Sequence, residues 1–125
     1  MTTPSPKKIL IVNDNRQEMV TLSQILLLNG YQLSYSEDEA IAIKLAKKTK
    51  PDLVICNTVS TKLDVTAFFR AVRSHAETRH VPFLFIAESK EQLKEQVGDL
   101  HPQNLLLKPF TREQLAITVQ ENLKR

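Results

Sequence analysis

The chain alternates short apolar runs with longer amphipathic segments from about residue 7 to its end. The apolar runs hold mostly Val, Ile, Leu and Phe, and their length is typical of strands in a buried sheet. We expect five strands, at residues 7–13, 31–36, 52–57, 81–87 and 103–108. The segments that follow them predict five helices, at residues 15–30, 37–50, 64–75, 89–100 and 111–125.

Polar residues at the expected helix starts support this assignment. Asp64 is suited to cap the third helix through its side chain. Ser89 and Thr111 each have a glutamine three residues further on, which is the spacing of a capping box. In the segment 37–50 the acidic residues lead and the lysines trail, as the helix dipole favours.

Strands that alternate strictly with helices predict a doubly wound α/β domain, in which a parallel sheet is covered by helices on both faces. The length of 125 residues fits one domain, which we place at residues 7–125 behind a disordered lead at 1–6. In such folds ligands bind where the strands end at their carboxyl edge. The residues at these positions are Asn13, Asp14, Asn57, Ala87, Glu88 and Lys108.

Composition and charge narrow the function classes. The net charge of +3 is small, and the basic residues are mixed with acids and not with aromatic side chains, so we expect no direct nucleic-acid partner. No apolar stretch reaches the roughly 18 residues that a membrane helix requires, so no membrane contact is expected. The single cysteine, Cys56, lies inside an apolar run and suits a buried thiol in a reducing compartment. These features predict a soluble, cytoplasmic protein.

Motifs for catalysis or cofactor binding are missing. Two glycines in the whole chain cannot form a phosphate-binding loop. The three histidines, His75, His80 and His101, lack the spacing and acidic or thiol neighbours of a zinc site. No serine or cysteine has a base placed beside it. We therefore expect neither an enzyme nor a cofactor.

Three stretches at these spacings, KILIVND (8–14), PDLVICN (51–57) and LLLKPF (105–110), resemble the receiver domain of two-component response regulators. The similarity extends over nearly the whole chain, from about Lys7. The resemblance implies a flavodoxin-like (βα)5 fold with a five-stranded parallel sheet of order 2-1-3-4-5.

The resemblance also shows which functional residues are altered. A receiver accepts a phosphoryl group on an aspartate, holds a divalent cation with two further acids, and binds the phosphoryl oxygens with a lysine. A serine or threonine then couples the phosphoaspartate to the surface. Matched to this pattern, the chain has Asn57 at the acceptor, Asn13 and Asp14 at the acidic pair, Ala87 at the hydroxyl, Leu105 at the switch aromatic and Lys108 at the lysine. Thr61 and Val65 replace the usual Pro and Gly of the loop after the third strand, where Asp64 is kept.

These changes predict a degenerate, pseudo-receiver pocket. A carboxamide at Asn57 cannot form an acyl phosphate, so we expect this position to be unmodified. With Asp14 as its one remaining acid, the pocket should bind Mg²⁺ weakly or not at all. We expect Asp14 to be the counter-charge of Lys108, with the Asn57 amide oxygen as a second acceptor. Asp14 could also cap the first helix, a role that is compatible with this pairing.

The function expected from this pocket is protein binding within a phosphorelay, independent of phosphorylation. A sensor kinase or an output domain is the expected partner, and a homodimer through helix four, strand five and helix five is possible. Leu105 and Ile117 are the candidate contact residues there, and Leu27 also lies off its buried helix stripe. Two alternatives remain: phosphorylation at another carboxylate, Asp14 or Asp52, and a small-ligand sensor that uses the vacated pocket near Lys108.

Overall fold

The computed structural model describes residues 5–59 and 63–124. Its strands are β1 (Lys8–Val12), β2 (Gln32–Ser36), β3 (Leu53–Asn57), β4 (Phe83–Ala87) and β5 (Leu105–Leu107). Its helices are α1 (Arg16–Leu28), α2 (Glu39–Thr49), α3 (Val65–Ser74), α4 (Lys90–Val97) and α5 (Arg112–Leu123), with a short 3-10 helix at Pro102–Asn104.

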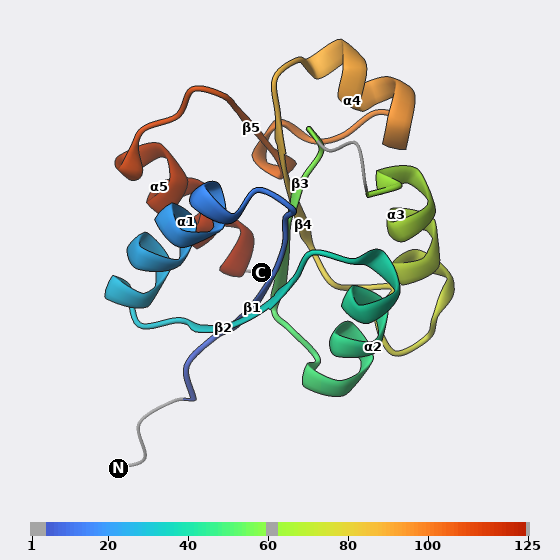
Figure 1. Cartoon of the computed structure of the whole chain (residues 1–125), viewed down its shortest axis with the longest axis horizontal. Coiled ribbons are helices and arrows are strands. Elements are labelled where there is room, and N and C mark those ends of the chain that lie inside the picture. Colours follow the sequence, from blue (N-terminus) through green and yellow to red (C-terminus); the bar gives the residue numbers. More distant parts are fainter. Residues whose placement is uncertain (1–4, 60–62, 125) are drawn as a thin grey trace.

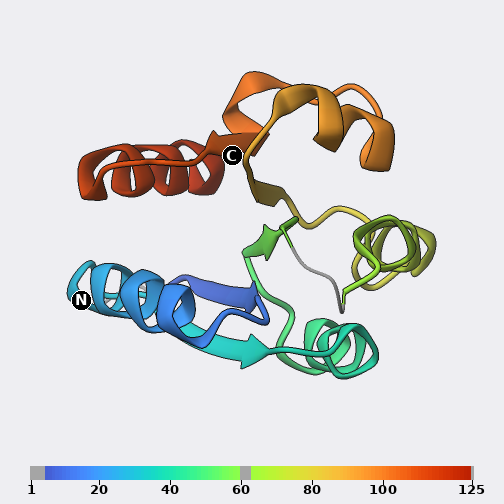
Figure 2. The ribbon, with the colours of Figure 1, turned by 45° about the horizontal axis from the view of Figure 1, so that its top comes forward.

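The five strands form one parallel sheet in the order β2-β1-β3-β4-β5 (Figure 1). Helices α1 and α5 lie on one face, and α2, α3 and α4 lie on the other (Figure 2). The doubly wound α/β fold with this strand order is thus confirmed. All strands point the same way, so their carboxyl ends meet along one edge of the sheet.

Alternate side chains of the central strands serve two hydrophobic cores. Ile9 and Ile11 of β1 pack with α1 and α5, whereas Leu10 and Val12 of the same strand pack toward α2 and α3. Every residue of β3 and β4 is buried, which explains why these strands read as continuous apolar runs. A sheet packed on both faces fixes the positions of the residues at its carboxyl edge.

Most element boundaries differ from the sequence expectation by one or two residues, and two of the differences have a clear structural reason. The last strand has three residues, because Pro102–Asn104 forms a 3-10 helix in which the Asn104 side chain donates to the Phe83 carbonyl oxygen, 2.9 Å away. The fourth helix ends at Val97, because Gly98 adopts a φ of 83° that ends the helix. The first four residues of the expected lead, and Thr61, lie outside the described residues.

Candidate functional site

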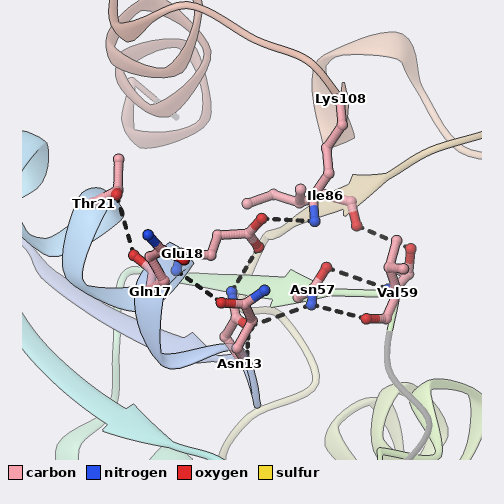
Figure 3. A network of polar contacts seen from close by, with 10 residues as sticks. Asn13, Gln17, Glu18, Thr21, Asn57, Val59, Ile86 and Lys108 are labelled. Carbon is pink, nitrogen blue, oxygen red and sulfur yellow. Dashed lines mark hydrogen bonds and ion pairs between the residues drawn. The ribbon is translucent and has the colours of Figure 1, made fainter.

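Three of the residues expected at the carboxyl edge, Asn13, Asn57 and Lys108, are joined there in one polar network (Figure 3), and we call this site the pocket. Asn13 follows β1, Asn57 ends β3, and Lys108 follows β5. The side chains of both asparagines are fully enclosed, with 0% and 1% of their surface exposed. The edge of the sheet therefore presents a buried amide pair beside a lysine.

The two amides bond to each other and to the backbone around them. Asn57 donates from Nδ2 to Asn13 Oδ1 (3.3 Å) and to the Val59 carbonyl oxygen (3.2 Å), and its Oδ1 accepts from the Val59 N–H (3.2 Å). Asn13 Oδ1 also accepts from the Asn15 N–H at 2.8 Å. Both amide oxygens thus point at N–H donors of the protein (Figure 3).

The counter-charge of Lys108 is Glu18, which corrects the expectation that Asp14 would have this role. Lys108 Nζ lies 2.6 Å from Glu18 Oε2, and both side chains are largely buried, with 23% and 17% exposed. Glu18 Oε1 accepts from Asn13 Nδ2 at 2.8 Å, so the ion pair and the amide pair form one network (Figure 3). The Asn57 amide oxygen bonds to the Val59 N–H instead of the lysine.

Helix α1 places Glu18 in this position. Its N-cap is Asn15, not Asp14, and the Asn15 side chain accepts from the Glu18 N–H at 3.0 Å. Glu18 is the third residue of the helix, where a glutamate usually folds back onto the N-cap backbone N–H. Here the Asn15 N–H donates to Asn13, and the Glu18 carboxylate is free to reach Lys108.

Glu18 is the site residue that the sequence analysis missed. The sequence does hold a signal for it, because an acid in the first turn after the first strand lies at the same edge as the strand ends. Its link to Lys108 depends on how α1 packs beside the start of α5, which no local pattern reveals.

Several other candidate residues also lie at this edge. Asp14 follows Asn13 and is partly buried. Ala87 is buried at the end of β4, and its carbonyl oxygen accepts from the Lys108 N–H at 2.9 Å. Glu88 is exposed beside it. Asp52 lies at the opposite, amino edge of the sheet, where its carboxylate accepts from the Lys8 N–H at 2.8 Å.

The candidate contact residues lie away from the pocket. Ile117 is 55% exposed on α5, as the sequence suggested. Leu105 is partly buried and packs against the core beneath α4, whereas its neighbour Leu107 is 44% exposed. A surface formed by α4, β5 and α5 therefore offers both apolar and polar groups, and its role stays a prediction.

Within the described part of the chain, no three His, Cys, Asp or Glu side chains gather as a metal site would require. Burial raises the pKa of the Cys56 thiol, next to Asn57, to about 12. This thiol is therefore protonated near neutral pH and unsuited to act as a nucleophile or a metal ligand. Among the described residues, no helix has the length and apolar character needed to cross a bilayer.

Comparisons with known proteins agree with the doubly wound fold. The profile of the response regulator receiver domain matches residues 9–120. The response regulator MprA of Mycobacterium sp. (strain KMS) is 29% identical over 122 residues, which cover 96% of this chain and 52% of MprA. The probable chemotaxis protein CheY of Rhizobium etli is 29% identical over 115 residues, which cover 90% of this chain and 89% of that protein.

Solved structures give the same result. The chemotaxis response regulator CheY4 of Vibrio cholerae superposes with a TM-score of 0.83 at 25% identity, covering 95% of this chain and 100% of CheY4. The chain therefore belongs to the response regulator receiver domain family, whose members serve two-component signalling. It spans about half the length of the MprA relatives that it matches.

Proposed function

We propose that this chain is a pseudo-receiver: a cytoplasmic receiver domain that works in two-component signalling by binding other proteins, without enzymatic activity and without accepting a phosphoryl group. Its expected partners are a sensor kinase or an output domain. The proposal concerns the state of the pocket, because family membership alone is compatible with phosphorylation.

One observation carries the proposal: the side chains at the acceptor and lysine positions are already bound to other groups of the protein. Asn57 holds the acceptor position with a carboxamide, which cannot form an acyl phosphate. Lys108 is in an ion pair with Glu18 at 2.6 Å, so an incoming phosphoryl group would have to displace that carboxylate. The pocket keeps the lysine and one acid of the family pattern, Lys108 and Asp14, and lacks the acceptor carboxylate.

The pocket also fits a magnesium ion poorly. Mg²⁺ requires near-octahedral oxygen ligands with at least one or two carboxylates among them. The amide oxygens of Asn13 and Asn57 accept from backbone N–H groups, and the Glu18 carboxylate is shared between Lys108 and Asn13. Of the positions at which the family holds its cation, only that of Asp14 keeps an acid. We therefore expect Mg²⁺ to bind weakly or not at all.

Incubation with acetyl phosphate and Mg²⁺ tests the proposal. The intact mass of the protein should stay unchanged, while an active receiver treated in parallel gains the mass of one phosphoryl group. A phosphorylated product, traced by fragmentation to Asn57 or a neighbouring carboxylate, would overturn the proposal. The same experiment decides the alternative in which Asp14 or Asp52 accepts the group.

Asp52 lies at the amino edge of the sheet, far from Lys108. This position disfavours Asp52 as the acceptor of a phosphoryl group. A small-ligand sensor is also less favoured, because an anion would have to compete with Glu18 for Lys108. Neither alternative has an observation of its own in the structure, and protein binding remains the better-supported function.

A further inference from the structure

A cavity of about 500 Å³ opens at the amino edge of the sheet, opposite the pocket. We call it the amino-edge cavity. Its walls are the second halves of α2 and α3, which lie side by side (Figure 2), and the segments that lead into β1, β3, β4 and β5. Its volume is in the range of small-molecule sites in proteins. Since doubly wound folds usually bind ligands at the carboxyl edge, an occupant of this cavity would define a second site.

The buried part of the cavity wall is mostly aromatic. Phe83 and Phe85 of β4 are buried and stack with 5.2 Å between their ring centroids. Phe69 of α3 is partly buried and lies edge-on to both rings, with centroids 5.2 and 5.6 Å away. Ala46 of α2 is also part of this wall. Three phenyl rings beside a small side chain suit a flat apolar group.

The outer part of the wall carries more positive than negative charge. Its acidic and basic residues are Lys7, Lys50, Arg73, Asp52 and Glu77. Within the described residues, none of the three cations is paired with a carboxylate. The Asp52 carboxylate instead accepts from the Lys8 N–H. Three cations against two carboxylates leave one positive charge, with His80 neutral, so an occupant with one negative charge would neutralise the cavity.

Arg73 lies where the aromatic and the charged parts of the wall meet. Its guanidinium carbon is 5.1 Å from the ring centroid of Phe69 and 5.0 Å from that of Phe83. Nη1 donates to the carbonyl oxygens of Arg79 (3.1 Å) and Val81 (2.7 Å), whereas Nε and Nη2 have no acceptor among the described residues. Desolvation lowers the pKa of Arg73, so a negative charge beside the guanidinium would stabilise it.

Lys50, at the rim of the cavity, has an unfavourable backbone conformation. It ends α2 with a φ of 48° and a ψ of 65°, in the left-handed region. Among the described residues, the others with a positive φ are glycines, Gly30 and Gly98. A Cβ atom disfavours this conformation, which glycine normally adopts at the end of a helix. Strained residues are frequent at functional sites, and here folding alone would favour glycine over lysine.

We propose that the amino-edge cavity binds a small aromatic carboxylate with a single negative charge. The aromatic group lies against Phe69 and Phe83. The carboxylate accepts from Nε and Nη2 of Arg73, which form a two-pronged donor edge, and it lies near the Lys50 ammonium group. This inference does not depend on the pocket at the carboxyl edge, so its failure would leave the proposed function untouched.

Titration with cinnamate, followed in amide NMR spectra, tests the site. A ligand of this size should bind with a Kd on the order of 1 mM. The signals of Phe69, Arg73 and Val81 should shift and saturate, while those of Asn13 and Lys108 stay in place. Cinnamyl alcohol has the same flat body without the charge and should bind at least about threefold more weakly. Equal affinity for both compounds, or no saturation by about 10 mM cinnamate, overturns the proposal.

The variant Lys50→Gly separates ligand binding from stability. Glycine adopts the left-handed conformation without strain, so the urea midpoint should rise. The Kd of cinnamate should rise about three- to fivefold because one cation is lost, whereas the Kd of cinnamyl alcohol should stay the same. The matched control is Lys44→Gln, which removes an exposed lysine of α2 outside the cavity and should change the cinnamate Kd by less than about twofold. Unchanged cinnamate binding in Lys50→Gly, or an equal loss in Lys44→Gln, would show that Lys50 does not hold the carboxylate and would overturn the proposal.

Discussion

At the scale of single residues, Glu18 decides the charge balance of the pocket. Asp14, Glu18 and Lys108 are charged groups of the pocket, with Glu88 exposed beside it, and Glu18 and Lys108 neutralise each other at 2.6 Å. The two asparagines add polarity without charge, and each uses its oxygen and its nitrogen in a hydrogen bond. A lysine that is largely buried requires a partner of this kind, because an unpaired charge in such surroundings is strongly unfavourable.

Replacing Glu18 by Gln removes this charge while keeping the shape of the side chain. Lys108 then lacks its counter-charge, and we expect the free energy of unfolding to fall by about 1–3 kcal/mol. Urea denaturation followed by circular dichroism measures the change. The matched control is Glu88→Gln, an exposed carboxylate near the same pocket, which should change stability by less than about 0.5 kcal/mol. Equal effects in both variants would contradict a structural role of the ion pair.

The thiol of Cys56 should be inert in the folded protein. Burial raises its pKa to about 12, so the reactive thiolate is scarce at pH 7 to 8, and the side chain is also inaccessible. We expect iodoacetamide to label Cys56 in urea and not in the native protein under the same conditions. Mass spectrometry of the intact chain reads out the labelling. Fast labelling of the native protein would contradict the burial of β3.

At the scale of elements, the first turn of α1 links the fold to the pocket. Asn15 caps the helix through the Glu18 N–H, and its own N–H donates to Asn13. The cap therefore sets the direction in which the Glu18 side chain leaves the helix. The capping box of α5, formed by Thr111 and Gln114, fixes another helix start by similar bonds but does not contact the ion pair.

Loss of the α1 cap should affect both stability and the site. We expect Asn15→Ala to cost about 1 kcal/mol and to shift the NMR signals of Glu18 and Lys108, because the helix start loosens. Asn15→Ser retains a capping oxygen and should restore most of both properties. Thr111→Ala is the comparison: it should cost a similar free energy without moving the signals of the pocket. Unchanged signals in Asn15→Ala would show that the cap does not position the ion pair between Glu18 and Lys108.

Much of this arrangement is predictable from sequence, and the remainder depends on tertiary contacts. Strands β3 and β4 were recognisable because burial on both faces makes them continuous apolar runs. The positions of Asn13, Asn57 and Lys108 followed from the rule that strand ends meet at one edge. The partner of Lys108 did not, because Glu18 reaches it only through the packing of α1 beside the segment that enters α5. The shortness of β5 likewise depends on Asn104, whose side chain bonds to β4 and to Asn122 on α5.

At the scale of the whole molecule, the pocket and the candidate contact residue Ile117 are separate. The pocket lies at the carboxyl edge of the sheet, whereas Ile117 is exposed on α5. In active receivers, the hydroxyl at the position of Ala87 couples the phosphorylated site to the surface around Leu105. An alanine has no group for that hydrogen bond, so the coupling is expected to be broken independently of the acceptor.

Restoring the acids at positions 13 and 57 separates the loss of the carboxylates from the loss of the coupling hydroxyl at position 87. We expect the double variant Asn13→Asp, Asn57→Asp to bind Mg²⁺ and beryllofluoride, since three carboxylates then gather at the edge with Asp14. In NMR spectra the resulting shifts should stay within the pocket, because Ala87 cannot transmit the change. Adding Ala87→Thr should extend the shifts to Leu105 and Leu107 on β5. Shifts that reach β5 without the threonine would show that the chain transmits the signal by another route.

If the double variant fails to bind Mg²⁺, Glu18 and not the lost acids controls the pocket, and Glu18→Gln added to the double variant should then allow binding.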